Sequence, residues 1–588
     1  MKIFAKKILA LGIYSALISA SVQAATYEVT EVNSISTNDN TTIIDENDSG
    51  ESVLIGTGVT DFSVQYQYFS ESDYDSIVSN AEASNELFFG IGDIEDEDAL
   101  RNGNPTDNDE FWVLVYLQSN AGLFSSQQFG DSTVLVNIDG TTEEVVIFDT
   151  TFENTGTLTR STVDTVTGIT NNGWIFGSGT APYLPVTFTD DNNTDDTDDD
   201  EIDNYWIRDF DLRAFYSVDK GQTVIPLVPP ESTYGGVSVI SDMSDSGVAI
   251  GYASTDIPDN VTEFLSETSE DCSSPEQLAE LPEIVCIDLV LTQNQLTLSD
   301  LYSTNAFKWI IGADGTVTSQ EALGQLITPH AEDTRGVSSF GQAVNDEGTV
   351  VGYADGWFKS NVTSPSKDEL RASTYAVVFK DNLVVELYPD HDDHFVSRAN
   401  DLNNSGISVG YANNGSINEF FYIDTSDIED MDIVFPESFF EGSASTANSV
   451  NEDGFVVGSA DFESNIGTRR KHAFMYDINT DTFTDLNDFI DCNSDYTIVD
   501  ANNINENNEI LATAIIKINV TDTDGNNTFD EVGEPIFDEV ARAIKLTPID
   551  GEIESCSVED DSVERQGASF GLFMPLILLL VGFRRKFI

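Results

Sequence analysis

The chain has 588 residues, of which 104 are acidic and 25 are basic, and its formal net charge is −79 at pH 7. A charge of this size repels nucleic acid, so we expect no nucleic-acid partner. The hydrophobic content of 40% excludes a disordered acidic protein, and the length indicates several domains or one large repeat assembly.

Residues 1–24 have the features of a signal peptide. Three lysines precede a short apolar run, and Val22 and Ala24 occupy the positions that a signal peptidase favours. The sequence therefore predicts cleavage between Ala24 and Ala25, with the Sec machinery and signal peptidase as partners. A retained anchor is the alternative, but the run is short because a membrane span needs about 20 apolar residues.

Internal repeats fill residues 165–550, and a first possible copy with an insertion falls in an N-terminal β region, residues 25–164. Each clear copy has Asn or Asp, a polar turn that ends in Gly, an apolar pair, a second Gly and a small or aromatic residue. Such turns supply the positive φ of a hairpin, and the apolar pair is typical of a short buried strand. The residues at the turn position are Gly50, Gly173, Gly247, Gly348, Gly406, Gly454 and Asn508.

A second signature follows several copies and predicts another strand in each unit. It occurs at Arg213–Tyr216, Asn305–Trp309, Tyr375–Phe379 and Lys471–Tyr476. The last units are spaced close to the about 40–50 residues that a four-stranded blade needs. The sequence therefore predicts an all-β fold, most consistent with an irregular, about seven-bladed β-propeller with insertions. A β-sandwich and a solenoid are the alternatives.

The insertions between repeats carry signals of their own. Phe62–Tyr68 alternates and predicts a half-buried strand, whereas Thr133–Ile138 and Glu144–Phe148 predict a hairpin around an Asp-Gly turn. Thr189–Glu201 is an acidic low-complexity loop, and a short helix is expected near Pro275–Leu281.

The chain has four cysteines, an even number that indicates disulfides in an exported protein. Cys272 and Cys286 would close a short loop. Cys492 and Cys556 would tie down the last repeat unit. Four cysteines allow three pairings, so the connectivity stays open at this point.

Catalytic signals are weak. Ser408 lies in a G-x-S-x-G match, but this segment is one copy of the repeat and no helix signal follows it, so we expect a structural serine and assign no catalytic residue. His391 and His394 are compatible with a divalent metal site, although we favour a solvated loop.

A calcium ion is the one cofactor that the sequence suggests. One acidic segment near the end of the repeats is rich in hard oxygen ligands, and it resembles a calcium loop. The candidate ligands are Asp522, Asp524, Asn526, Asp530 and Glu531. Aligning Gly525 with the invariant EF-hand glycine puts Val520 at the first ligand position, so the strict motif fails. A long acidic hairpin loop is the alternative.

An acidic linker, residues 551–566, leads to an apolar C-terminal tail, residues 567–588. The apolar run covers only about 20 Å as a helix, less than a hydrocarbon core of about 30 Å. The tail resembles the GlyGly-CTERM class of sorting signals, which implies processing by a rhomboid-type sortase and contact with a membrane. The residues that carry this resemblance are Gly567, Ala568, Ser569, Arg584, Arg585 and Lys586. A plain transmembrane anchor is the alternative.

The paired repeat signatures resemble the HAF repeats of bacterial extracellular proteins, and the whole chain is similar to an uncharacterised family of secreted gamma-proteobacterial proteins. These resemblances imply β architecture and export but no known activity. Our preferred hypothesis is a secreted or cell-surface β-repeat protein with a binding, scaffold or adhesive role and no catalysis. The alternatives are an extracellular polymer-degrading hydrolase or lyase and a calcium-stabilised structural module.

Overall fold

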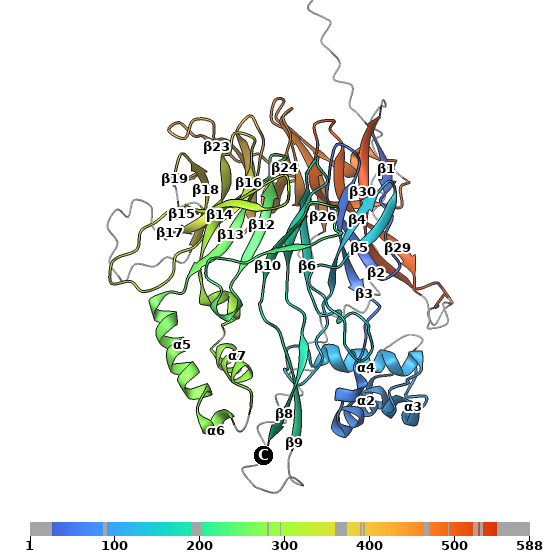
Figure 1. Cartoon of the computed structure of the whole chain (residues 1–588). Helices are drawn as coiled ribbons and strands as arrows, with labels where there is room; N and C mark the ends of the chain where they lie inside the picture. Colours follow the sequence, from blue (N-terminus) through green and yellow to red (C-terminus); the bar gives the residue numbers. More distant parts are fainter. Residues whose placement is uncertain are drawn as a thin grey trace, which may run out of the picture.

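The structure is a computed structural model that describes residues 26–85, 91–190, 201–278, 281–294, 296–358, 373–388, 391, 394–463, 470–491, 493–520, 527–529 and 533–549. In these residues the strands form seven four-stranded antiparallel sheets and one separate hairpin (Figure 1). The first strand of each sheet contacts the first strands of both neighbouring sheets, in an unbroken circle. This arrangement is a seven-bladed β-propeller, as the repeats predicted, and it replaces the sandwich and solenoid alternatives.

Blades 1 to 4 follow the chain, each from its inner to its outer strand. Blade 1 contains β2 (Asn38–Glu46), β3 (Ser52–Val59), β4 (Ser132–Ile138) and β5 (Thr141–Val145). Blade 2 contains β6 (Asp164–Ile169), β7 (Ile175–Gly179), β10 (Arg213–Ser217) and β11 (Ile225–Leu227). Blade 3 contains β12 (Ser238–Met243), β13 (Val248–Asp256), β14 (Ser303–Ile311) and β15 (Val317–Gly324). Blade 4 contains β16 (Ser339–Val344), β17 (Val350–Gly356), β18 (Ser373–Lys380) and β19 (Leu383–Glu386).

The remaining blades complete the circle. Blade 5 contains β20 (Val396–Leu402), β21 (Ile407–Asn413), β22 (Asn418–Asp424) and β23 (Ile433–Val434). Blade 6 contains β24 (Ser445–Val450), β25 (Phe455–Asp461), β26 (Lys471–Asp477) and β27 (Thr482–Asp485). Blade 7 contains β28 (Thr497–Ile504), β29 (Ile510–Asn519), β30 (Phe537–Ile549) and β1 (Thr26–Glu31).

The predicted turn residues all lie between the first and second strands of their blades. All seven have a positive φ, from 59° at Asn508 to 90° at Gly406, which Gly and Asn adopt with the least strain. Side chains in these turns also link neighbouring blades, since Asn403 Nδ2 donates to Asn451 O (3.0 Å) and Asn451 Nδ2 donates to Asn505 O (3.1 Å). The repeated Asn therefore forms part of its own turn and also holds the turn of the next blade through a hydrogen bond.

The second signature forms the third strand of its blade, as predicted. Its alanine is fully buried in each copy, so a larger side chain would not fit between the blades. The alanines are Ala214, Ala306, Ala376 and Ala473. The backbone N–H of Ala306 donates to Ser339 Oγ (2.9 Å), which joins this strand to the inner strand of the next blade.

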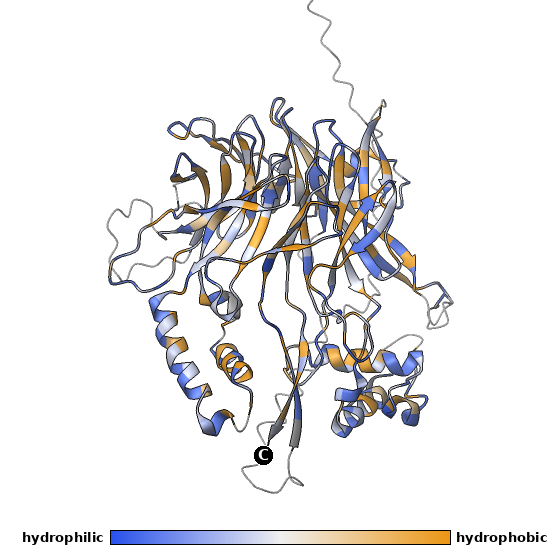
Figure 2. Ribbon diagram, viewed as in Figure 1, coloured by the Kyte–Doolittle hydropathy of each residue, from blue (hydrophilic) through white to orange (hydrophobic). Residues whose placement is uncertain are grey.

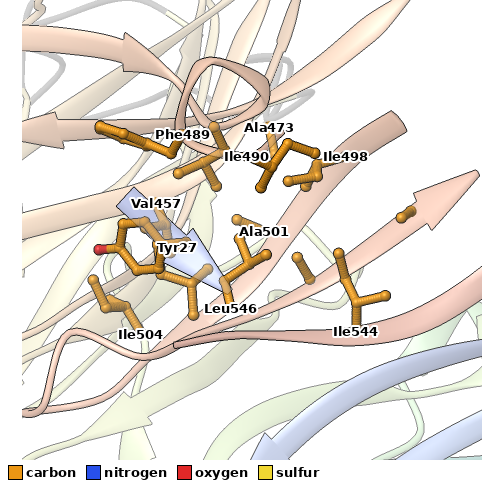
Figure 3. Close-up of a cluster of buried hydrophobic side chains, with 14 residues drawn as sticks. Tyr27, Val457, Ala473, Phe489, Ile490, Ile498, Ala501, Ile504, Ile544 and Leu546 are labelled. Atoms are coloured by element: carbon orange, nitrogen blue, oxygen red, sulfur yellow. The ribbon is translucent and has the colours of Figure 1, made fainter. Parts of the chain in front are cut away.

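The circle closes through β1, which pairs antiparallel with β30 and completes blade 7. Thr26 lies opposite Ile549 in this pairing. Tyr27 is 6% exposed and packs in the core of the last blades with Val457 and Leu546 (Figure 3). The propeller is therefore closed by strands from opposite ends of the described chain.

Three long insertions join the second strand to the third strand of their blades, so they leave the propeller at the same end. Figure 1 shows them below the propeller, on what we call the insertion face. Blade 1 carries η1 (Tyr66–Tyr68), α2 (Glu71–Ser84), α3 (Glu97–Arg101) and α4 (Asp107–Ser119). Blade 2 carries the hairpin of β8 (Leu184–Asp190) and β9 (Glu201–Ile207). Blade 3 carries α5 (Asp259–Cys272), α6 (Pro275–Leu278), α7 (Glu283–Gln293) and η4 (Leu298–Leu301).

The insertion of blade 1 has its own small core. Ile77 of α2 and Trp112 and Leu117 of α4 pack together with at most 2% exposure. Figure 2 shows apolar residues along α4, and also along α7, which lies beside the more polar α5. Two short helical turns, η3 (Thr233–Gly235) and η5 (Leu486–Phe489), lie within the propeller connections.

Some local predictions were wrong. Phe62–Tyr68 is a loop that ends in a helical turn, because Ser70 caps α2 directly afterwards and the aromatic side chains of Tyr66 and Phe69 join the helical core. The hairpin partner strand begins at Thr141, earlier than predicted. The short helix α6 was expected, but the longer α5 and α7 on either side of it were not.

In the described part of the chain, no helix is both long and apolar enough to cross a membrane. The predicted signal cleavage site at Ala24 and Ala25, the acidic linker and the C-terminal tail lie outside the described residues. The signal peptide, the sorting signal and the anchor therefore stay predictions.

The closing strand provides a test of the architecture. Replacing Tyr27 with Ala should lower the free energy of unfolding by about 3–5 kcal/mol, because it empties an aromatic site between the last blades. Glu28→Ala, on the exposed side of the same strand, should change it by less than about 0.5 kcal/mol. Urea unfolding of the two variants measures the difference, and equal losses would contradict closure through β1.

Candidate functional site

Five partly exposed side chains gather near the propeller axis on the side of the insertion face. They come from blades 3, 4 and 5, and we call them the axial cluster. Its members are Tyr252 of β13, Phe340 of β16, Tyr353 of β17, Arg398 of β20 and Tyr411 of β21. The tyrosines directly follow the glycine of the repeat, a position that holds small residues in the other blades. Sequence reasoning noticed this aromatic position but did not assign it a function.

The axial cluster is a continuous aromatic surface with one cation on it. The guanidinium carbon of Arg398 lies 4.3 Å from the ring centroid of Tyr353. The ring of Phe340 also stacks on the ring of Tyr353, with centroids 4.6 Å apart and an interplanar angle of 20°. Tyr252 meets Phe340 edge to face at 4.9 Å. The cation and the rings therefore hold each other in position.

Several hydrogen-bond donors of the axial cluster have no protein acceptor. Arg398 Nε is buried and makes no hydrogen bond. Burial raises the pKa of Tyr252 to about 12 and raises the pKa of Tyr353, although the charge of Arg398 opposes the shift of both. These two phenols therefore remain protonated donors at neutral pH, beside an arginine that forms no ion pair within the described chain.

The close approach of two inner strands explains the glycine beside this cluster. A Cβ atom on Gly410 would lie 2.0 Å from the carbonyl oxygen of Arg398 on the adjacent strand. Gly352 has the same relation to the carbonyl oxygen of Phe340. The repeated glycine therefore lets the second strand press against the inner strand at the level of the axial cluster.

Three carboxylates lie farther along the axis, and we call them the axial carboxylates: Asp45, Asp242 and Asp401. Each directly follows a β-bulge in the inner strand of blade 1, 3 or 5. Each accepts a backbone hydrogen bond from the inner strand of the next blade. The donors are Ile169 (3.0 Å), Val344 (2.8 Å) and Val450 (2.8 Å).

Protein atoms surround the axial carboxylates, and this burial raises the pKa of all three. The pKa of Asp45 rises to about 7 and that of Asp242 to about 6. The backbone hydrogen bonds oppose the shift, whereas the charges of the other two axial carboxylates add to the shift of Asp45. The side chains keep partial exposure, so they line the inner surface of the propeller.

The inner surface is therefore polar along its length. The inner strand of each blade runs from the insertion face toward the turns on the opposite face. Arg398 is the third residue of β20, and Asp401 lies three residues later, about 10 Å along the strand. The cation is thus near the insertion face and the carboxylates lie deeper.

A second feature of the insertion face is a cavity of about 170 Å³ between the hairpin of blade 2 and α7. Arg208 forms an ion pair with Asp211 and lies 5.0 Å from the ring centroid of Tyr183. Burial raises the pKa of Asp288, which the charge of Arg208 opposes. The walls of this cavity come from all three insertions, with Phe124 as the contribution of blade 1.

The cysteine pair supports one wall of this cavity. Cys272 and Cys286 form a disulfide that joins α5 to α7. Both sulfur-bearing residues are buried in the core of the insertion, with 1% and 8% exposure. Cys492 and Cys556 lie outside the described residues, so their pairing stays a prediction.

Ser408, His391 and His394, which the sequence also singled out, are buried in the fold. Ser408 is fully buried in β21, and its hydroxyl donates to the carbonyl oxygen of Asp401 (3.0 Å), as expected of a structural serine. The solvated-loop hypothesis was wrong for the two neighbouring histidines, which are 7% and 8% exposed. His391 stacks on Tyr375 and His394 hydrogen-bonds to Glu419 (3.1 Å), because both rings pack against the outer part of blades 4 and 5.

The candidate calcium ligands Asp522, Asp524, Asn526, Asp530 and Glu531 lie outside the described residues. In the part of the chain that is described, no group of three or more His, Cys, Asp or Glu side chains is arranged to hold a metal ion. Calcium therefore stays a prediction on the connection between β29 and β30.

The fold and its inner surface define the class of protein: a closed seven-bladed propeller with one face enlarged by insertions. Within this class the chain belongs to the family described as "Protein of unknown function (DUF3466)", whose model matches residues 4–586. No curated protein matches the chain.

Solved structures that resemble the chain do so at low identity. The β-propeller domain of the Trilobed protease from Pyrococcus furiosus matches with 7% identity over 73% of this chain and 91% of that chain, at a TM-score of 0.29. A Mycobacterium tuberculosis puromycin-hydrolyzing peptidase matches with 11% identity over 70% of this chain and 50% of that chain, at 0.33. A protein of unknown function from Dyadobacter fermentans DSM 18053 matches with 10% identity over 90% of this chain and 99% of that chain, at 0.32.

The raised pKa of Asp45 predicts a pH-dependent stability. The folded state holds the proton up to about pH 7, whereas the unfolded chain loses it near the ordinary value of 3.8. This contribution is present in full below about pH 4 and is lost as the pH rises through 7. Between about pH 5 and pH 8, Asp45→Asn should therefore lose less stability than the wild type, by on the order of 2 kcal/mol.

The control for this test is Asp48→Asn, which removes an exposed carboxylate from the same blade. Urea unfolding at both pH values gives the comparison. If the two variants showed the same pH dependence, burial would not perturb Asp45.

Proposed function

We propose that this protein is exported and that it binds a ligand on its insertion face, without transforming it. The observation that carries the proposal is the placement of the insertions. All three long insertions leave the same end of a rigid propeller, and the axial cluster opens toward that end. Loops on a rigid scaffold commonly carry binding function, because the scaffold fixes their position.

Two features support a binding surface on this face. The axial cluster offers unpaired donors and aromatic rings, and the cavity beside α7 offers charged groups within an apolar wall. Binding sites commonly combine apolar and aromatic walls with a few placed polar groups. In contrast, the opposite face carries the short turns of the repeats.

Export is proposed from the sequence. Residues 1–24 have the pattern of a signal peptide, and the tail resembles a sorting signal. A disulfide between Cys272 and Cys286 suits an oxidising compartment. The high net negative charge suits a salty medium, where counterions screen the repulsion.

A binding screen tests the proposed function. Protein lacking residues 1–24 and 567–588 should bind at least one ligand in a panel of neutral and acidic polysaccharides and envelope components. Replacing residues 258–301 with the short connection Asn414–Ile417 of blade 5 removes α5 to α7 and should weaken that binding at least about tenfold. Shortening residues 426–431, a connection on the opposite face, should leave it unchanged.

The same panel separates the alternatives. No binding to any member would contradict the proposal. Turnover of a polysaccharide that is lost on a single Asp or Glu substitution would favour the hydrolase or lyase instead. A melting temperature that falls on calcium chelation would support the calcium-stabilised module.

Maturation is tested separately by intact mass. Protein recovered from the cell envelope or the medium of the native host should begin at Ala25 and lack a segment that starts near Gly567. Its mass would also report whether the cysteines are oxidised. Recovery of the full-length chain from the cytoplasm would contradict export.

A further inference from the structure

Among the described residues, Arg213 and Arg398 each have a buried Nε without a hydrogen bond, but Arg213 donates through Nη2 to the carbonyl oxygen of Gly235, whereas the side chain of Arg398 makes no hydrogen bond. The chain carries 104 acidic residues, yet the structure places no carboxylate within ion-pair distance of Arg398 in the described residues. Its Nε is buried without a hydrogen bond, which is costly for a charged group unless something supplies an acceptor. The aromatic contact with Tyr353 holds the guanidinium in place but does not satisfy its N–H groups.

The surroundings favour an anion with a flat body. A guanidinium over a ring face keeps its in-plane donors directed sideways, where a carboxylate can accept two parallel hydrogen bonds. The phenol hydroxyls of Tyr252, Tyr353 and Tyr411 make no hydrogen bond to the described protein and can donate as well. Phe340 and Arg398 already lie over the ring of Tyr353, so the apolar surface left for a small ring is the ring of Tyr411 and the partly exposed edges of the other rings.

We propose that the axial cluster binds a carboxylate carried on a small ring, with the carboxylate on Arg398 and the ring against the aromatic side chains. This inference rests on the proposed binding function and names the chemistry of one ligand. A sugar acid and an aromatic acid share this chemistry. A cation is disfavoured because Arg398 occupies the aromatic surface that would otherwise attract it.

The axial carboxylates limit how far the ligand enters. An anion that reaches Arg398 from the insertion face meets Asp401 about 10 Å farther along β20, and Asp45 and Asp242 hold the equivalent position in their own blades. When ionised, these groups repel a second anion, so one carboxylate is held near the insertion face. A ligand with a single carboxylate at its end fits this arrangement.

Calorimetry with defined probes tests the proposal. Glucuronate and benzoate represent the two sources of the carboxylate, and glucuronamide and benzamide are their neutral counterparts. Protein lacking residues 1–24 and 567–588, in about 0.15 M salt to screen the overall negative charge, should bind at least one acid and bind its amide at least about tenfold more weakly.

Variants assign the binding to the cluster. Arg398→Gln should weaken the acid at least about tenfold, whereas Tyr411→Phe, which removes only a hydroxyl, should weaken it about two- to tenfold. Lys380→Gln removes one positive charge far from the axis and should change nothing. If Arg398→Gln melts at a much lower temperature than the wild type, its weaker binding could reflect unfolding. The Tyr411→Phe variant and the comparison of acid with amide then test the inference.

The results have distinct meanings. Tighter binding of glucuronate identifies a sugar acid, and tighter binding of benzoate identifies an aromatic acid. Equal binding of acid and amide, or unchanged binding by both Arg398→Gln and Tyr411→Phe, would overturn the inference. Binding of neutral polymers in the screen together with no binding of either acid would overturn this inference alone and leave the proposed function standing.

Discussion

The pairing of β1 with β30 is the contact on which the rest of the structure depends. It brings together strands at opposite ends of the described chain, with Thr26 opposite Ile549. Every blade has a neighbour on both of its faces only if the last blade meets the first. The core between blades 7 and 1, which includes Ile43, Leu511 and Ala543, exists only when the circle is complete. Bringing the two ends of so long a chain together costs conformational entropy once. After closure, every interface between neighbouring blades contributes to the stability of the folded state.

The circle also sets the polarity of the inner surface. The position after each bulge holds Asp in blades 1, 3 and 5 and a small residue in blades 2, 4 and 6: Gly168, Ala343 and Ser449. Each Asp can therefore reach across to the backbone of the next blade. With an odd number of blades, a further Asp in blade 7 would lie beside Asp45. Asn503 occupies that position and its Nδ2 donates to Asp45 Oδ1 at 2.8 Å, which avoids two adjacent carboxylates.

This arrangement gives the axis two different ends. Buried carboxylates with raised pKa values lie deep in the ring, and a single arginine with free donors lies near the insertion face. The insertions enlarge that face, and a disulfide joins the two longer helices of one of them. The axial cluster, the cavity beside α7 and the insertions thus face the same side, which is where we place the ligand.

The sequence was informative where the cause of a structure is local. The turn residues from Gly50 to Asn508 need a positive φ whatever surrounds them, so each copy could be recognised alone and counted to seven. It failed where a segment takes its structure from distant contacts. Phe62–Tyr68 alternates like a strand, but Tyr66 packs into the core of α2 and α4. The sequence singled out Cys272 and Cys286 as a pair but not the helices α5 and α7 that their disulfide joins, because those helices pack in a core that includes distant residues such as Val237.

The sequence by itself therefore determined the repeat, an approximate number of blades and the predicted signals at the two ends, because turn geometry and targeting patterns are properties of short segments. Only the tertiary structure decided which strand closes the circle, which face the insertions share, and which side chains meet at the axis. Arg398 and Tyr353 belong to different blades, and their contact follows from the curvature of the whole ring. Because this contact joins two blades, no pattern within a single repeat predicts it.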